Sequence, residues 1–570
     1  MAIASQEKDS RNDGGSAAVR SAAVRSEALR PAALTAGAVP RILAMAALFV
    51  AAGILEARSV SSLAAKGSSD VWWHLRTGLW ILQNHTLPHA GLFSQMAERP
   101  WRAVSWIYDV KLAVFYRLLG LRAIPIFAVG FKAALAVVTF LLARGHRGNF
   151  WAAVMVSAVA QYVLGGMAPA PVYGSVLFFG IELVILLESR RGRCPSGAKA
   201  PSTLSARNGA AKAASLQSEA QQGPLGGSQQ LSLRYSRPKV LLWLVPLFLV
   251  WANVDAQFVY GLGLLILFLL ARVVEEWWRE PAKESGTGGA GIGRLKAITG
   301  ACFVATLVTP YFYGPYEVFL AKAFSAANVY LPDTYAPGFR QPQDYVLVLF
   351  VMAAFLAVGL RRSTDIFLIA LLAITTALAF HSRQDIWVVV LAVPAVMGEM
   401  FDGVELRDEA GERRRALDGG EFGMTEFWIA AGSAVVILVA AVAVVMPRGE
   451  GKLLAKAGEN YPVGACNYIR ENRLPQPIFN SLEWGGFLTW YLPEYPVAID
   501  GRIDVYGDEF IVEYSRMMNA DVRYTQFAPI ANAQTIVLPR TAIMAQALGS
   551  LPAYKVVYSD DVAIVLRRVI

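Results

Sequence analysis

Long apolar stretches separated by short polar segments fill most of the chain between residues 40 and 446. A helix needs about 20 apolar residues to cross the hydrocarbon core of a bilayer, and most of these stretches approach that length. The pattern therefore predicts about eleven membrane-spanning helices. We place them at 40–57, 121–143, 150–168, 171–188, 239–254, 256–274, 296–316, 344–360, 365–381, 386–400 and 426–446.

Residues 447–570 show a different pattern, in which short β-rich runs alternate with helical ones. Runs of this length, bounded by Gly, Pro and Asp, are typical of a small α/β domain. The predicted fold class is mainly α, a polytopic transmembrane helical bundle with a small C-terminal extracytoplasmic α/β domain. We expect β-rich runs at 483–492, 496–500, 535–539 and 563–566, and helices at 510–518 and 542–551.

The composition agrees with a membrane protein and excludes several other classes. Hydrophobic residues make up 55% and charged residues 17% of the 570 positions, and the mean hydropathy is +0.42. Soluble globular proteins carry about 25% charged residues. These values exclude disordered, collagen-like and small disulfide-rich chains. Cys194, Cys302 and Cys466 lie far apart and fit no metal-ligand spacing, so we expect no disulfide framework.

The formal net charge is +9, and the position of the basic residues decides what this charge means. Lys and Arg strongly outnumber acidic residues in 189–238, a Ser-, Gly- and Ala-rich stretch between two apolar runs. This is typical of a flexible cytoplasmic loop that follows the positive-inside rule, and not of a nucleic-acid-binding surface. We interpret residues 1–40, which are rich in Ala, Ser and Arg, as a disordered cytoplasmic arm. An odd number of spans in the transmembrane domain, 41–446, then places 447–570 outside the cytoplasm.

The first loop after a predicted span, residues 58–120, contains the most informative motif of the chain. Asp70 stands at a Ser-Ser-Asp helix start, and His74 follows one turn later on the same helical face. Trp72 and Trp73 give this helix a surface that favours the membrane interface. Asp70 is therefore a candidate general base for a substrate met at the membrane surface. A helix N-cap followed by an aromatic anchor is the alternative interpretation.

A second amphipathic segment of the same loop begins at Trp106 and has Asp109 near its start. Asp109 either brings a second carboxylate to the site or caps its own helix. Pairing of Asp109 with Lys111 or Arg102 is a further alternative.

Three histidines of this loop, His74, His85 and His89, raise the question of a metal site. Pro88 interrupts the pair at 85 and 89, and no acidic cluster accompanies it. We therefore expect no zinc site, while assistance by a divalent cation stays open. The chain has no phosphate-binding Gly-rich loop, dinucleotide fingerprint or nucleophile elbow, so no organic cofactor is indicated.

Two further acidic positions are site candidates. Asp255 lies between two apolar runs, where an ionisable side chain is costly unless it is hydrated, paired or functional. Its neighbours Asn253 and Gln257 would equally suit a polar hairpin turn. The segment from Asp500 to Asp504, Asp-Gly-Arg-Ile-Asp, is either a substrate-binding lip or an internal salt-bridged turn. Its Gly and its apolar flanks favour the turn.

The motif Asp-x-Trp-Trp-His-Leu-x-x-Gly, which begins at Asp70, resembles the first outside loop of GT-C superfamily glycosyltransferases. The Leu-Pro, Phe-Ser and Arg-Pro-Trp pieces that follow it belong to the same resemblance. The bacterial branch akin to protein mannosyltransferases and lipid A aminoarabinose transferases is the most similar. Trp251-Ala-Asn, Ser382-Arg-Gln-Asp and the segment from Asn480 to Tyr506 extend this resemblance over most of the chain.

The resemblance implies transfer of a sugar from a polyprenyl-phosphate donor to a protein, lipid or glycan acceptor, among the lipids of a bacterial-type cytoplasmic (inner) membrane. In such enzymes a first-loop Asp acts as general base or positions the acceptor hydroxyl. This implies catalytic roles for Asp70 and Asp109, at the outer face of the membrane. Arg383, at the mouth of a span, suits the lipid phosphate, with interfacial snorkelling or a pair with Asp385 as the alternative. The implied substrate-binding residues are His74, Arg76, Trp73, Asp255 and Arg383.

Three departures from the family pattern keep other functions open, because relatives carry Asp, Arg and His where this chain has Gly91, Ala170 and Asp255. A degenerate transferase fold that binds polysaccharide without turnover is one alternative. A non-catalytic membrane transporter or a lipid-handling protein is another. Transporters usually show related halves, whereas the repeat found here is only SAAVR at 16–20 and 21–25.

Overall fold

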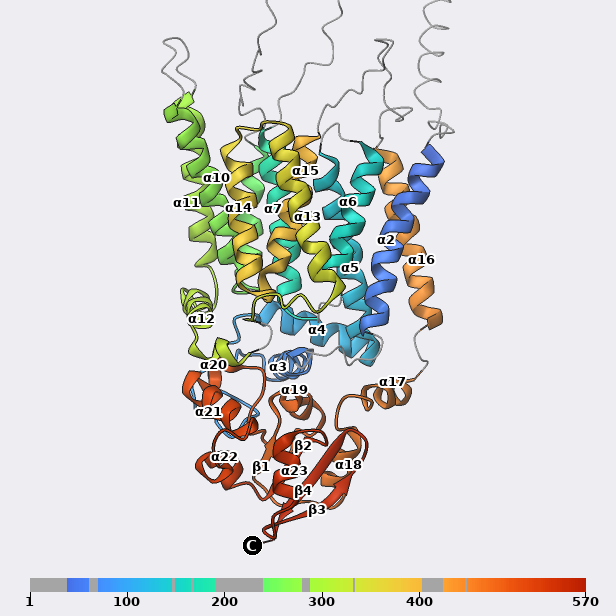
Figure 1. Ribbon diagram of the computed structural model, residues 1–570, viewed down its shortest axis with the longest axis vertical. Helices are drawn as coiled ribbons and strands as arrows, with labels where there is room; N and C mark the ends of the chain where they lie inside the picture. The colour runs from blue at the N-terminus through green and yellow to red at the C-terminus, as the bar shows by residue number, and fades with distance from the viewer. Residues whose placement is uncertain are drawn as a thin grey trace, which may run out of the picture.

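The computed structural model describes residues 38–60, 70–145, 149–165, 169–190, 239–278, 288–331, 334–401, 424–445 and 449–569. The expected arm at 1–40 and the expected basic loop at 189–238 lie outside these residues except at their edges. The described residues form a bundle of roughly parallel helices and a C-terminal body (Figure 1). Two further helices lie across the end of the bundle, between it and the C-terminal body.

Each apolar stretch that we expect to span a membrane overlaps a helix of the bundle. By length and composition, five described stretches could cross a membrane: Ala38–Glu56, Trp106–Arg144, Val172–Arg190, Phe258–Trp278 and Pro342–Leu360. Other apolar helices are shorter, so the count of about eleven spans stays a prediction. The bundle helices are α2 Ala38–Val60, α5 Ala123–Arg144, α6 Phe150–Val163, α7 Val172–Arg190, α9 Leu244–Trp251, α10 Phe258–Trp278, α11 Gly288–Thr306, α13 Pro342–Leu360, α14 Ile366–His381, α15 Ile386–Met400 and α16 Met424–Val445.

The predicted span at 296–316 is divided in the structure. α11 ends at Thr306, and α12, Gly314–Ala323, begins only after the turns around Pro310. Proline has no backbone N–H to continue a helix and restricts the residue before it, so the helix ends ahead of this position. As a result α12 lies at the end of the bundle, near the C-terminal body (Figure 1).

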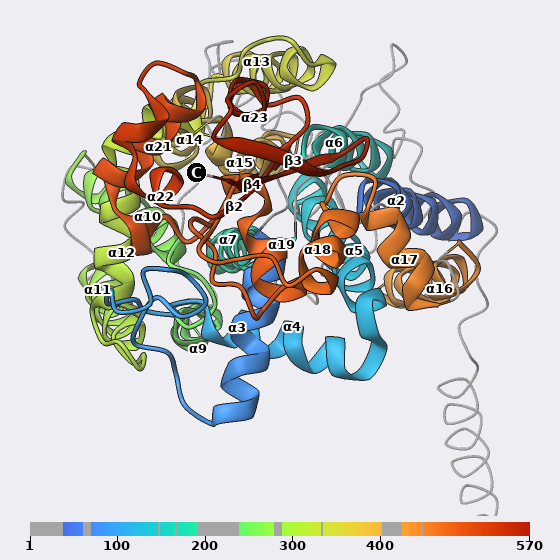
Figure 2. The same cartoon turned by 90° about the horizontal axis from the view of Figure 1, so that it is seen from below.

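α3, Asp70–Asn84, and α4, Trp106–Leu119, are the two helices that lie across the end of the bundle (Figures 1 and 2). The sequence predicts both, from the Ser-Ser-Asp start and from apolar residues at helical spacing. They pack closely because Gly78 has no side chain: a Cβ there would lie 2.0 Å from the carbonyl oxygen of Asp109. The exposed face of α4 carries apolar side chains such as Leu118, as expected for a helix at a membrane interface.

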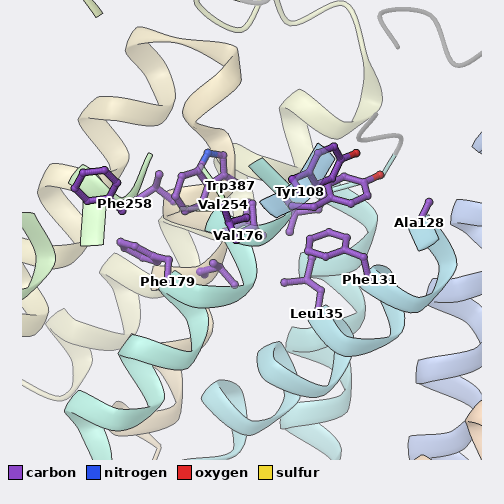
Figure 3. Close-up of a cluster of buried hydrophobic side chains, with 14 of the residues drawn as sticks. Tyr108, Ala128, Phe131, Leu135, Val176, Phe179, Val254, Phe258 and Trp387 are labelled. Atoms are coloured by element: carbon purple, nitrogen blue, oxygen red, sulfur yellow. The ribbon is translucent and has the colours of Figure 1, made fainter. Parts of the chain in front are cut away.

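α15 is the central helix of the bundle, and its side chains from Val388 to Val396 are all buried. At its start, the Trp387 ring packs edge-on against Phe179 of α7, with 5.4 Å between the ring centroids. Tyr108 of α4 and Phe131 of α5 lie in the same cluster (Figure 3). The apolar core therefore continues from the bundle into the crossing helix α4, which fixes the position of α4 at the end of the bundle.

The C-terminal body contains a four-stranded sheet in the order β1-β2-β4-β3. β1 pairs parallel with β2, and the other two pairs are antiparallel, with Val537 opposite Val565 between β2 and β4. The small α/β arrangement that the sequence predicts is present. The elements are α17 Glu450–Ala457, α18 Val463–Glu471, β1 Ile478–Asn480, α19 Leu482–Tyr491, α20 Ile503–Tyr506, α21 Asp508–Met518, α22 Ala528–Ala531, β2 Thr535–Pro539, α23 Ile543–Gly549, β3 Tyr554–Ser559 and β4 Ala563–Arg568.

The β-rich run expected at 483–492 is wrong, because this segment forms helix α19. Its aromatic and Thr residues favour strands, but Gly485 lets the segment pack as a helix against a neighbouring backbone. A Cβ at Gly485 would lie 2.0 Å from the carbonyl oxygen of Ile499. Tertiary packing thus overrides local preference. The run at 496–500 is no regular strand either, and makes one isolated bridge, from Val497 to the first loop.

Trp72 of α3 joins the crossing helix to the C-terminal body and is fully buried. Its ring stacks on Trp490 at 4.7 Å and meets the edges of Phe487 and Tyr461 at 5.2 and 5.6 Å. We expect Trp72→Ala to lower the free energy of unfolding by about 3–5 kcal/mol, because it opens a cavity in this cluster. Trp72→Phe, which keeps an aromatic ring, should cost clearly less. Chemical unfolding followed by circular dichroism measures both losses, and equal losses would contradict this assignment.

Candidate functional site

Asp70 is the first residue of α3, and its half-buried carboxyl accepts a hydrogen bond from the indole N–H of Trp73 at 3.2 Å. Burial raises the pKa of the Asp70 carboxyl above its ordinary value. The fields of His74 and Lys322 and the Trp73 hydrogen bond oppose this shift, whereas the charge of Asp500 adds to it. A carboxylate with a raised pKa is a stronger base than an ordinary one, so the environment suits Asp70 to accept a proton.

Asp109 of α4 is buried against His74 of α3, with 2.5 Å between its Oδ1 and the Nδ1 of the imidazole. The alternative pairs proposed for Asp109 are wrong, because Lys111 lies over a phenylalanine ring and Arg102 pairs with Glu317. A carboxylate on Nδ1 fixes the tautomer and orientation of a histidine and leaves Nε2 for other contacts. Asp109 is therefore arranged to hold His74. His74 lies one helical turn along α3 from Asp70.

Lys322, near the end of α12, is an exposed cation whose field reaches several buried acidic groups. Burial raises the pKa of the Asp70, Asp255 and Asp385 carboxyls, and the field of Lys322 opposes each of these shifts. The same holds for the pKa of Asp504 in the C-terminal body. Carboxyls from four segments that are distant in sequence therefore lie within the electrostatic influence of one lysine. Sequence reasoning did not find this lysine.

Asp255 lies in the turn between α9 and α10, where the Ser175 hydroxyl donates a hydrogen bond to its Oδ2 at 2.6 Å. The indole N–H of Trp251 donates in turn to the Ser175 oxygen at 2.8 Å. Burial raises the pKa of Asp255, and the Ser175 hydrogen bond is the main opposing influence. The polar hairpin turn is present as well, because the backbone N–H of Asp255 donates to the Trp251 carbonyl at 3.0 Å. Asp255 is thus a turn residue and also a site candidate.

Arg383 begins a short 3-10 turn, Arg383–Asp385, between α14 and α15. Its guanidinium donates to Oδ1 of Asp344 at 3.3 Å, and 42% of its side chain stays exposed. The proposed alternative pair with Asp385 is wrong, because Asp385 accepts a hydrogen bond from the Tyr260 hydroxyl at 2.8 Å instead. Arg383 therefore keeps an accessible cationic edge, which a role in phosphate binding requires.

The two remaining candidates of α3, Trp73 and Arg76, contact different parts of the structure. The Trp73 ring stacks on His74, with 3.5 Å between the centroids, and so belongs to the surroundings of Asp70. Arg76 follows Asp70 by six residues and places its guanidinium 5.2 Å from the centroid of Phe93. Burial lowers the pKa of Arg76 below its ordinary value. The structure therefore brings Trp73 to the site of Asp70 and directs Arg76 toward Phe93, later in the first loop.

Asp504 is the second residue of α20, and desolvation of its carboxyl raises its pKa to about 6. The folded state then binds a proton more tightly than the unfolded state, so the stability contribution is present at low pH and is lost as the pH rises through 6. We expect Asp504→Asn to be more stable than wild type at pH 7, with the difference vanishing near pH 4. Although desolvation of the carboxyl raises its pKa, the residue as a whole is exposed to solvent and its charge is screened, so the gain should be about 1 kcal/mol or less. Thermal unfolding between pH 4 and pH 8 measures it, and a constant difference over this range would contradict it.

Within the described residues, no three His, Cys, Asp or Glu side chains lie close enough together to hold a metal ion. His85 and His89 are both exposed, and the His89 ring faces Tyr311 rather than a carboxylate.

An open, mostly apolar cavity of about 400 Å³ lies beside the start of α4. The first turn of α4, residues between 249 and 253, and residues 308–310 line it. The indole N–H of Trp106 donates to Oδ1 of Asn253 at 3.0 Å, which gives the cavity one polar edge. Asp109 follows Trp106 by three residues along α4 and does not line the cavity.

No protein-family model and no curated protein matches this chain by sequence. Among solved structures, the apo oligosaccharyltransferase of Archaeoglobus fulgidus is similar with a TM-score of 0.47 and 11% identity, over 88% of this chain and 69% of that one. AglB from the same organism, in complex with an inhibitory peptide and a dolichol-phosphate, is similar with a TM-score of 0.45 and 10% identity, over 87% of this chain and 69% of that one. ArnT from Cupriavidus metallidurans, bound to undecaprenyl phosphate, is similar with a TM-score of 0.40 and 15% identity, over 92% of this chain and 97% of that one. These neighbours are GT-C superfamily membrane glycosyltransferases, the superfamily that the first-loop motif resembles.

Proposed function

We propose that this chain is a membrane glycosyltransferase that moves a sugar from a polyprenyl-phosphate donor to an acceptor hydroxyl. The observation behind the proposal is the half-buried carboxyl of Asp70 at the start of α3, within the field of the exposed Lys322. A base for the hydroxyl and a cation for the phosphate are the two groups that such a transfer needs. α3 and α12, which carry them, lie between the apolar bundle and the C-terminal body, which is where a lipid-linked sugar would be met (Figure 1).

In the proposed reaction, the acceptor oxygen forms a bond to the anomeric carbon of the sugar while the bond from that carbon to the phosphate oxygen breaks. The hydroxyl proton passes to the Asp70 carboxylate, and the electron pair of the broken bond leaves with the polyprenyl phosphate. Lys322 and Arg383 neutralise the charge that develops on this phosphate. His74, held by Asp109, adds a polar contact next to the base.

The apolar surroundings suit a lipid carrier. The cavity beside the start of α4 is mostly apolar and open, so it offers space for isoprenoid units at the helix that carries Asp109. Basic residues concentrate in the loop at 189–238, and the positive-inside rule places that loop in the cytoplasm. The site and the C-terminal body, at the opposite end of the bundle, would then face away from the cytoplasm.

Purified protein in nanodiscs, given a panel of radiolabelled polyprenyl-phosphate sugars and a membrane-extract acceptor pool, tests the proposal. Transfer that requires Asp70 supports it and identifies the sugar. Binding of a donor without turnover across the panel would instead favour the non-catalytic transporter, the lipid-handling protein or the degenerate transferase fold. Equal transfer by wild type and Asp70→Asn would move the base to Asp109 or Asp255.

A further inference from the structure

The turn that precedes α20 in the C-terminal body is held by a fully buried ion pair. The guanidinium of Arg502 donates from Nη2 to Oδ2 of Asp500 at 2.6 Å and from Nε to Oδ1 at 3.0 Å. The backbone N–H of Arg502 donates to the same Oδ1 at 2.9 Å. Both side chains are buried, so these bonds form without competition from water and fix the backbone of the turn. The salt-bridged turn expected from the sequence is therefore confirmed.

The turn Asp500–Arg502 also contacts the first loop, residues 58–120. The Arg502 guanidinium lies 4.9 Å from the ring centroid of Trp101 and 5.6 Å from that of Phe93. The backbone N–H of Val497 donates to the carbonyl of Phe93 at 3.1 Å, and the N–H of Gln95 donates back to Val497 at 2.9 Å. Cation–π contacts and backbone hydrogen bonds thus set the turn in a defined position relative to α3.

Gly501, between the two ion-paired residues, is the point at which this turn meets Asp70. A Cβ added to Gly501 would lie 2.0 Å from Oδ1 of Asp70 and 3.0 Å from Nε1 of Trp73. These are the two atoms that form the hydrogen bond at the start of α3. The Cα of Gly501 therefore packs directly against the Asp70–Trp73 hydrogen bond, and a larger residue there would have to displace the Asp70 carboxyl or the turn.

We propose that the turn Asp500–Arg502 is a positioning element for Asp70, in which Gly501 orients the carboxyl toward Trp73 and shields one side of it from water. The C-terminal body is then a part of the site and not an appendage to it. The functional meaning rests on the proposed role of Asp70 as the base, but the packing can be tested without any activity.

Thermal unfolding of the full-length protein in detergent tests the packing through a double-mutant cycle. Gly501→Ala should lower the midpoint by about 3 °C or more in the wild-type background, because the new methyl meets the carboxyl oxygen. In an Asp70→Ala background, which lacks that oxygen, the loss should be clearly smaller. Gly549→Ala in α23, whose Cβ would meet side chains only at 3.9 Å, is the matched control and should act equally in both backgrounds. Equal losses from Gly501→Ala in the two backgrounds would overturn the proposal.

Transfer assays separate positioning from a merely structural effect. Gly501→Ala should lower kcat at least about tenfold with the donor KM unchanged, because the base is displaced, and should cause no further loss in Asp70→Asn. The acid limb of the pH profile should move to lower pH, since the displaced carboxyl gains water. The titratable groups that face Asp70 are unchanged in this variant: His74 of its own helix, Tyr108 of α4, Lys322 of α12, and Tyr461 and Asp500 of the C-terminal body.

Two outcomes distinguish this inference from the proposed function. A lowered midpoint with normal transfer and an unmoved acid limb would show that the turn is structural only and would overturn its positioning role. Absence of transfer in wild type would count against the proposed function, while the unfolding cycle would still decide whether Gly501 packs against Asp70.

Discussion

Asp70→Asn should lower the rate of sugar transfer by about 10²–10⁴-fold, with donor binding retained. Asparagine has nearly the shape of aspartate, and its side-chain oxygen can still accept the Trp73 hydrogen bond that holds the side chain at 3.2 Å. What it cannot do is accept the proton of an acceptor hydroxyl. The loss should therefore appear in kcat rather than in the donor KM. Single-turnover transfer with the identified donor, in nanodiscs, measures the two separately.

The matched control for this variant is Asp521→Asn, which makes the same change at an exposed aspartate of the C-terminal body. It should leave transfer unchanged.

The pH profile of transfer is a second, independent test of Asp70 as the base. Because burial raises its pKa, transfer should decline with falling pH at a higher pH than the ordinary aspartate value of about 3.9 would give. A profile flat down to pH 4, or an Asp70→Asn variant with normal kcat, would count against Asp70 as the base.

Much of the fold could be predicted from the sequence, because it rests on local patterns. The apolar stretches and the Ser-Ser-Asp start of α3 are signals contained in neighbouring residues, and the structure has helices at these places. Predictions were wrong where tertiary contacts override local preference. α19 is a helix although its aromatic residues favour strands, since Gly485 allows the helix to pack against the backbone at Ile499. The division of the 296–316 stretch, by contrast, had a local signal in Pro310.

The site was harder to predict because its parts come from distant segments. The sequence singles out Asp70 through a local motif, and it finds Asp255 because a charge between apolar runs is unusual. Lys322 stands in a stretch of mixed charge and belongs to no motif, so only the position of α12 beside the C-terminal body reveals it. For Gly501, the turn was predictable but its contact with the first loop was not.

Lys322→Met should lower kcat/KM for transfer by about 10²-fold, because the charge that develops on the leaving phosphate loses its cationic partner. Lys322→Arg, which keeps the charge, should retain most of the activity. The same lysine lowers the pKa of Asp70 against the larger effect of burial, so Lys322→Met should also move the acid limb of the pH profile to higher pH. These two effects arise from one charge acting on two groups, the donor phosphate and the base.

The control for this prediction is Lys452→Met, at an exposed lysine of α17 in the C-terminal body. It removes the same charge from the protein and should leave both kcat/KM and the acid limb unchanged. A loss of kcat/KM in Lys322→Met with an unmoved acid limb would place the lysine at the phosphate but beyond the reach of Asp70. If neither quantity changes, Lys322 lies outside the site, and Arg383 becomes the cation expected to meet the donor phosphate, because its exposed guanidinium lies at the same end of the bundle.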